Sequence, residues 1–143
     1  MIRVAVTDDL ATCLSLRRAV FIEEQGVPEA EEVDGRDGDA VHMLATRDGA
    51  PVGTARILIL GDTGKIGRVC VLPAARGTGA GVALVQAAVA HLRGVPGVAR
   101  ARLGAQVHAV GFYARLGFAA EGPVYDDAGI PHRDMVLPLT PGP

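Results

Sequence analysis

The hydrophobic and polar positions of this chain follow two periods, one typical of strands and one typical of helices. Alternation or short apolar runs predict strands at residues 2–6, within 41–60, at 65–72, at 98–105 and within 118–139. The segment 41–60 contains an Asp48-Gly49 turn, and 118–139 contains an Asp-Asp-Ala-Gly turn, so each is expected to form two strands. A helical period predicts helices from Leu10 through Phe21, at 82–92 and at 108–117.

The order of these elements predicts one mixed sheet. The strands between residues 41 and 72 are joined by short turns, which is typical of an antiparallel meander. The strand at 65–72, the helix at 82–92 and the strand at 98–105 require a right-handed parallel crossover. We therefore expect an α/β (α+β) fold with a mostly antiparallel sheet and helices on both faces. Residues 1–143 should form a single domain, with a flexible tail at 138–143.

Composition excludes several classes of protein. With 14 basic and 16 acidic residues the net charge is −2, so no nucleic-acid partner is expected. Every apolar run is too short to cross a bilayer, and the N-terminus lacks the regions of a secretion signal. Cys13 and Cys70 are too few for a disulfide framework and lack metal-ligand spacing. The resulting prediction is a cytoplasmic protein that needs neither a membrane nor a metal.

Three alternating glycines, Gly77, Gly79 and Gly81, precede the predicted helix at 82–92. A helix N-terminus has unpaired N–H groups that bind phosphate if the backbone can approach closely, and glycine permits that approach. A P-loop would end in Gly-Lys-Ser/Thr, but Gly81 is followed by Val82 and Ala83. A dinucleotide fingerprint would need the spacing GxGxxG and a later acidic residue, and both are missing. A pyrophosphate site of another kind remains, or a structural loop in a chain with 19 glycines.

The same segment resembles a known superfamily. Arg76, Gly79 and Gly81 fit the Arg/Gln-x-x-Gly-x-Gly/Ala signature of the GNAT N-acetyltransferases, after a hydrophobic strand and "VLP". Downstream, "GFYARLGF" at 111–118 resembles their Tyr-x-x-x-Gly-Phe element. "VFIEEQGVP", "VDGRDGDAVHML" and "DDAGIPH" are similar to the small bacterial ElaA-like branch, so the resemblance covers most of the chain.

The resemblance implies a site for acetyl-CoA. Its pyrophosphate would bind the backbone N–H groups of residues 77–82, namely Gly77, Thr78, Gly79, Ala80, Gly81 and Val82, and Arg76 would add charge. The pantetheine arm would pair with the backbone of Val69, Cys70 and Val71, where an N–H could polarise the thioester carbonyl. Tyr113 would protonate the departing thiolate. Gln106 stands where relatives often have an asparagine that contacts the cofactor.

The general base is not identified by the resemblance. Many relatives have a glutamate on the strand before the loop, but residues 64–72 contain no carboxylate. Glu23, Glu24 and His42 are the candidates, although a solvated glutamate or a histidine bonded within the sheet is the ordinary alternative. His108 and His132 are expected to be ordinary surface histidines.

Two further residues bear on the acceptor and on the route. Arg68 is expected to hold a carboxylate or phosphate of the substrate, or to be a paired surface arginine. No partner in the sequence activates Cys70 as a nucleophile, which favours direct attack in a ternary complex.

The leading hypothesis is an acetyl-CoA-dependent N-acetyltransferase acting on a primary amine of a small molecule or protein. The alternative is a non-catalytic acyl-CoA-binding sensor, and a homodimer is compatible with either. Residues 23–39 carry eight acids and one base, Arg36, so they should attract a cationic amine at the acceptor cleft or form a solvated loop. The eight acids are Glu23, Glu24, Glu29, Glu31, Glu32, Asp34, Asp37 and Asp39.

Overall fold

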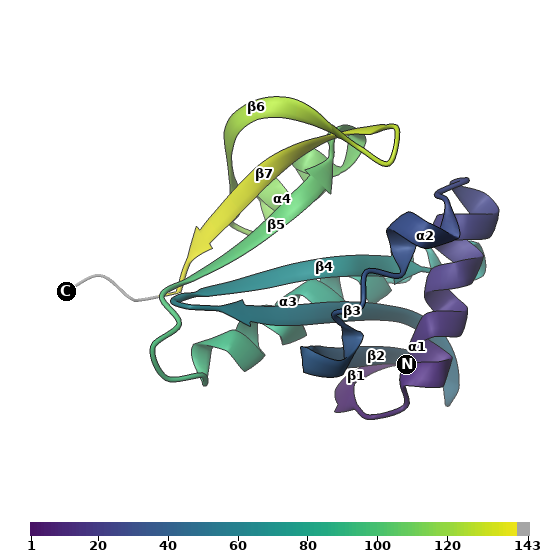
Figure 1. Ribbon diagram of the computed structural model, residues 1–143. Coiled ribbons are helices and arrows are strands. Elements are labelled where there is room, and N and C mark those ends of the chain that lie inside the picture. The colour runs from purple at the N-terminus through teal and green to yellow at the C-terminus, as the bar shows by residue number, and fades with distance from the viewer. Residues whose placement is uncertain (140–143) are drawn as a thin grey trace.

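The computed structural model describes residues 1–139 and contains one mixed seven-stranded sheet of order β1-β2-β3-β4-β5-β7-β6 (Figure 1). The first four strands pair antiparallel with their neighbours: β1 (Ile2–Thr7), β2 (Val41–Arg47), β3 (Ala50–Leu60) and β4 (Thr63–Val71). Of these, β2, β3 and β4 form the predicted antiparallel meander. The rest are β5 (Arg100–Gln106), β6 (Ala119–Asp127) and β7 (Ile130–Pro138). Only the β4–β5 pair is parallel among these strands, so the predicted fold class and crossover are confirmed.

The helices lie on both faces of the sheet. Helix α1 (Leu10–Arg17) is N-capped by Asp9 and continues as a π-helical segment, η1 (Arg18–Glu24). Helix α3 (Ala80–Arg93) forms the crossover, and α4 (Val110–Arg115) follows a short 3₁₀ turn, η4 (Val107–Ala109). The short segments α2 (Glu29–Glu32) and η2 (Asp37–Asp39) lie on the α1 side, as Figure 1 shows.

Successive side chains of β3 contact the α3 layer and the α1 layer in turn. Ala55 and Ile57 belong to the main hydrophobic core, which includes Leu84 of α3. The intervening Arg56 bonds instead to the acidic segment beside α1. Because successive side chains of a strand point to opposite faces, α3 and α1 must cover opposite sides of the sheet.

Strands β4 and β5 pair over only three residues each and then separate. The register joins Thr63–Lys65 to residues 100–102 and goes no further. The two strands diverge from this point, as Figure 1 shows. A register shift against β3 between Thr54 and Arg56 places a bulge in β4 at Arg68, whose φ is 52°. Because β4 and β5 pair over only three residues, the sheet is split between these two strands.

The C-terminal end differs from the expectation of a tail at 138–143. Pro138 is the last residue of β7, and Leu139 is buried, with 5% of its surface exposed. Residues 140–143, the rest of that expected tail, lie outside the described residues. Within residues 1–139, no helix has the length and apolar character needed to span a membrane.

Candidate functional site

The separation of β4 and β5 opens a cleft of about 770 Å³ in the middle of the sheet. Its two long walls are residues 65–71 of β4 and part of β5, including Leu103 and Gln106. Residues of η1, α2, η4, α4 and the β6–β7 hairpin also line it, together with loop residues such as Asp34 and Arg76. Beyond Lys65, the edge of β4 that faces β5 has no strand partner among residues 1–139. An extended ligand can therefore pair with its backbone as an added strand.

The glycine-rich loop leads from β4 into α3. Gly77 and Gly79 have φ angles of 80° and 90°, and a Cβ at either position would meet no atom within 4 Å. Gly79 is the N-cap of α3 and supplies no side-chain cap. In the described chain, no loop or cap hydrogen bond is donated by the backbone N–H of Gly77 or of residues 79–82. The loop thus presents unpaired donors and open space at a helix N-terminus, as a phosphate site requires.

Gly81 has a different structural role from the two glycines before it. A Cβ at this position would lie 3.4 Å from the ring of Phe112 in α4. This is an ordinary van der Waals distance, so α3 packs against α4 here, next to Tyr113, and the position also has room for an alanine.

Arg76 and Glu24 form an ion pair that the sequence did not predict. Nη1 and Nη2 of Arg76 donate to the two carboxylate oxygens of Glu24 at 2.6 and 2.5 Å, and Nε donates to the carbonyl of Val71. The hydrogen bond and charge of Arg76 lower the pKa of Glu24. Both side chains line the cleft. A carboxylate with a lowered pKa is a weaker proton acceptor, which opposes the expected role of Glu24 as the base.

Tyr113 and Gln106 line the cleft as well. The Tyr113 ring packs edge-to-face against Phe112 and Phe118, with centroids 5.0 and 6.1 Å away. Burial raises the pKa of Tyr113 to about 12, so its hydroxyl stays protonated at neutral pH. Gln106 ends β5, and its Nε2 donates to the side-chain oxygen of Gln25 at 3.0 Å.

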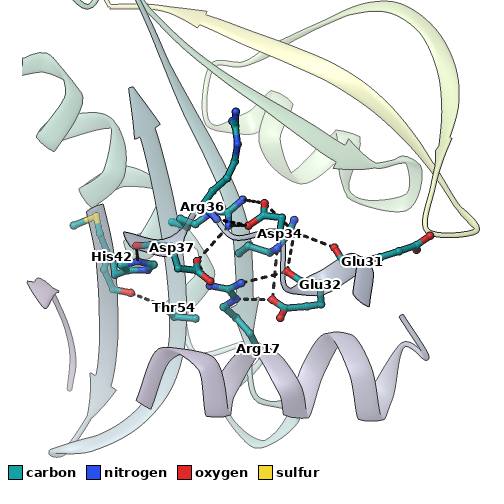
Figure 2. A network of polar contacts seen from close by, with 11 residues as sticks. Arg17, Glu31, Glu32, Asp34, Arg36, Asp37, His42 and Thr54 are labelled. Atoms are coloured by element: carbon teal, nitrogen blue, oxygen red, sulfur yellow. Dashed lines mark hydrogen bonds and ion pairs between the residues drawn. The ribbon is translucent and has the colours of Figure 1, made fainter. Parts of the chain in front are cut away.

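Three arginines from three elements bind the acidic segment in one largely buried network, shown in Figure 2. We call Arg17, Arg56, Arg68, Glu32, Asp34 and Asp37 the arginine–carboxylate network. Arg17 Nε donates to Glu32 at 2.6 Å and Nη1 to Asp37 at 2.7 Å, while Arg56 binds both oxygens of Asp34 at 2.8 Å. The arginines hold the pKa of Asp34 well below its usual range, through the Arg56 hydrogen bonds above all.

This network corrects the expectation of a negative potential over residues 23–39. The network neutralises three of the eight acids, and Arg18 and Arg76 pair with Glu29 and Glu24. The count within the segment was misleading because the five compensating arginines lie outside it, on α1, η1, β3, β4 and the loop before α3. The segment does border the cleft, through residues 24, 31, 32 and 34.

Arg68 lines the cleft from the bulge in β4 and is the most loosely held arginine of the network. Its Nη2 donates to the carbonyl of Glu32 at 3.0 Å, but its distances to the carboxylates of Glu32 and Asp34 are 3.5 Å. Burial, together with the charge of Arg56, lowers the pKa of Arg68. Its Nε is buried without a hydrogen-bond partner in the described chain.

His42 and Cys70 are not suited to the chemistry considered for them. His42 is buried in β2, its Nε2 lies 2.9 Å from the Asp37 carbonyl, and it is not among the residues that line the cleft. It is bonded within the fold, so the structure does not bring it to the cleft as a base. Cys70 lines the cleft, but burial raises the pKa of its thiol to about 12. Little thiolate forms at neutral pH.

The sequence matches the family described as Acetyltransferase (GNAT) domain over residues 7–139. The chain belongs to the GNAT acetyltransferase family. This acyltransferase is 32% identical over 130 residues to a Bacillus subtilis protein named "Uncharacterized N-acetyltransferase YjcF", covering 90% of this chain and 92% of the other. An acyl-CoA N-acyltransferase from Pseudomonas aeruginosa is 34% identical, with a TM-score of 0.85 and coverage of 96% and 99%. Escherichia coli ElaA is 32% identical, with a TM-score of 0.84 and the same coverage. The predicted superfamily and ElaA-like branch are confirmed.

The sequence did not predict the burial of two residues of this acetyltransferase, Arg17 and His132. Arg17 lies four residues after the buried Cys13 and three before Val20, so a charged residue on an apolar helix face was the available signal. The expectation for His132 was wrong, since this residue is buried and lines the cleft. It lies opposite Tyr125 in the hairpin, a pairing that the Asp-Asp-Ala-Gly turn could have indicated.

Proposed function

We propose that the chain transfers the acetyl group of acetyl-CoA to a primary amine of a small molecule or protein, by direct attack in a ternary complex. One observation carries this proposal: the split between β4 and β5 joins an unpaired strand edge to a helix N-terminus with free N–H groups. An acyl thioester with a pyrophosphate has the length and the groups to use both features. The family assignment supports an acyltransferase over a non-catalytic sensor.

The residues present fit acetyl-CoA. The N–H groups of Gly77 and residues 79–82 would bind the pyrophosphate, and that of Thr78 would join them on leaving the Ala75 carbonyl. Gly77 and Gly79 have no side chains to occupy its space. The backbone of residues 69–71 would pair with the pantetheine amides. Arg76 would release the carboxylate of Glu24 and bind the phosphates, which adds positive charge to the site. Gln106 would contact the cofactor from β5, if its bond to Gln25 is exchanged.

Tyr113 would supply a proton to the leaving thiolate. Burial raises its pKa to about 12, so the hydroxyl is protonated at neutral pH. The nitrogen of the neutral amine forms the new C–N bond as the C–S bond breaks, and the sulfur then takes the phenolic proton. Cys70 stays a thiol, which favours this direct route over a covalent acetyl-cysteine.

Arg68 would contact the acceptor. It borders the cleft, and its long ion pairs leave the guanidinium able to hold a carboxylate or phosphate of the substrate. Under this proposal Arg68→Met raises the KM of an anionic amine and leaves that of acetyl-CoA unchanged.

Calorimetric titration with acetyl-CoA tests the proposed site. Gly79→Val puts a branched side chain at a φ of 90° in the phosphate's space, and acetyl-CoA affinity should fall at least tenfold. Gly97→Val is the matched control, because Gly97 has a φ of 82°, equally open space, and a position beyond the other end of α3. Equal affinity in the two variants would overturn the assignment of the loop.

A further inference from the structure

The proposed reaction requires a proton acceptor, and neither β4 nor Glu24 nor His42 supplies one. An alkylammonium with a pKa near 10.4 must lose a proton before its nitrogen can attack. Within residues 64–72 there is no carboxylate, Glu24 is bound by Arg76, and His42 lies outside the cleft lining. The base must come from another wall of the cleft.

His132 is the buried histidine of that cleft, with 9% of its surface exposed. It lies in β7, directly opposite Gln106 of β5 and Tyr125 of β6. The other histidine in the lining, His108, is exposed, and its Nε2 lies 2.7 Å from the side-chain oxygen of Gln106. His132 is therefore held in the wall, whereas His108 lies at the surface.

The hydrogen bonds of His132 fix the state of its ring. Nδ1 lies 2.7 Å from the carbonyl oxygen of Ile130, and a carbonyl oxygen can only accept. In the neutral imidazole the hydrogen is therefore on Nδ1, and the lone pair is on Nε2. Among the described residues, Nε2 has no hydrogen-bond partner. A proton acceptor is thus left available on a residue of the cleft wall.

A second set of contacts fixes the orientation of the ring. The ring of Tyr125 stacks on His132, with centroids 5.9 Å apart and planes 25° apart. The Tyr125 hydroxyl donates to Asp134 at 2.8 Å, and Asp134 accepts from Arg102 at 2.6 Å. A Cβ on Gly104 would lie 2.5 Å from that hydroxyl, so only glycine leaves room for Tyr125 in this position. Three strands hold the imidazole in place.

We propose that His132 is the general base that takes the proton from the acceptor amine through Nε2. This inference rests on the proposed function. His132 removes one proton from the ammonium and later releases it to solvent. The amine lone pair forms the C–N bond, the C–S electron pair moves to sulfur, and sulfur takes the Tyr113 proton. The nitrogen's second proton then restores Tyr113, so one proton is released per acetyl group transferred.

The test compares His132→Asn with wild type and with His91→Asn, because His91 lies in the last turn of α3 and is not among the residues that line the cleft. The asparagine amide can still donate to the Ile130 carbonyl, but nothing replaces Nε2. With the fastest amine from a panel of alkylamines, amino sugars and amino acid amides, we expect kcat/KM for the amine to fall about 10²-fold or more. Acetyl-CoA affinity should not change, and His91→Asn should retain at least a third of the activity.

The pH profile separates proton transfer from a structural role. Other titratable groups around His132 are Tyr125 and Asp127 on β6, Asp134 on β7, Arg102 on β5, His108 in η4 and Glu31 across the cleft. Burial, with the Asp134 hydrogen bond, raises the pKa of Tyr125 to about 12, so it does not titrate near neutral pH. Wild-type kcat/KM should level off above neutral pH, whereas His132→Asn should rise about tenfold per pH unit toward the pKa of the amine. Added imidazole should partly restore His132→Ala.

Each outcome has a distinct meaning. If the wild type acetylates no amine in the panel, the proposed function fails and the base assignment fails with it. If the wild type is active and His132→Asn is within threefold of it, or shows the same pH profile without imidazole rescue, the base assignment alone is overturned. A long-range ¹⁵N–¹H spectrum of the wild-type protein does not depend on how the variants fold. It should show hydrogen on Nδ1 of neutral His132, and hydrogen on Nε2 would overturn the inference.

Discussion

Replacing Arg17 by methionine removes the most deeply buried cation of the arginine–carboxylate network. The Arg17 side chain is 1% exposed, and its partners Glu32 and Asp37 are 3% and 12% exposed. Breaking a buried pair leaves an uncompensated charge and costs about 3–5 kcal/mol. At an unfolding entropy of about 2 cal/mol/K per residue, that loss lowers the Tm of a domain this size by about 10–17 °C.

Urea unfolding followed by circular dichroism measures this effect. Arg18→Met is the matched control, because the adjacent Arg18 pairs with Glu29 at the surface, where both side chains are more than half exposed. An exposed pair contributes about 1 kcal/mol or less, so Arg18→Met should hardly move the midpoint. Adding Glu32→Gln to Arg17→Met should recover part of the loss. Equal destabilisation by the two single variants would refute the claim that burial gives the network its importance.

The same network predicts the response of stability to acid. Burial alone would raise the pKa of Asp37, but Arg17 and Arg56 outweigh it, and the pKa is lowered. A carboxyl whose folded pKa lies below its unfolded value, about 3.9, contributes stability above that value and loses it as pH falls toward the folded pKa. The wild type should therefore lose stability steeply below about pH 5, and Arg17→Met should lose less over the same range.

Two further predictions concern the cleft. Glu24→Gln should bind acetyl-CoA a few-fold more tightly than the wild type, because Arg76 no longer has a competing carboxylate; weaker binding in calorimetry would show that Glu24 positions Arg76 rather than competing for it. Tyr113→Phe should lower kcat by about 10²-fold or more with little change in acetyl-CoA affinity, since only the hydroxyl is lost. In the wild type, a pKa of about 12 predicts no alkaline limb from Tyr113 below about pH 11. A limb near pH 9 that disappears in Tyr113→Phe would contradict that assignment.

The sequence predicted the elements of the fold because hydrophobic periodicity is a local signal. The turn at Asp48-Gly49 and the glycines before α3 mark chain reversals and a helix start that depend on few neighbours. The same local chemistry predicted glycine conformations suited to a phosphate site, and Gly77 and Gly79 do adopt positive φ angles, while the phosphate site itself stays a prediction. The separation of β4 from β5 after three paired residues was not predicted, because no residue of either strand marks where the pairing ends.

The sequence did not predict which charges meet, because partners lie far apart along the chain. Arg56 is separated by 22 residues from Asp34, and Arg76 by 52 from Glu24. Glu24 was a candidate base because a sequence does not distinguish a free carboxylate from one that is bound by a distant arginine. The burial of His132 also depends on the pairing of β5, β6 and β7. Predicting such contacts requires the pairing register of the whole sheet, which no local stretch of sequence determines.

Initial-velocity kinetics test the central claim, that the cleft catalyses direct acetyl transfer, most directly. Release of CoA thiol is measured while acetyl-CoA and the best amine of the panel are varied together, and the acetylated amine is quantified by mass spectrometry. A ternary complex predicts thiol release that depends on both substrates, one acetylated amine per thiol and intersecting double-reciprocal lines. Parallel lines would indicate an acetylated enzyme, and thiol release independent of every amine would contradict the proposed N-acetyltransferase activity.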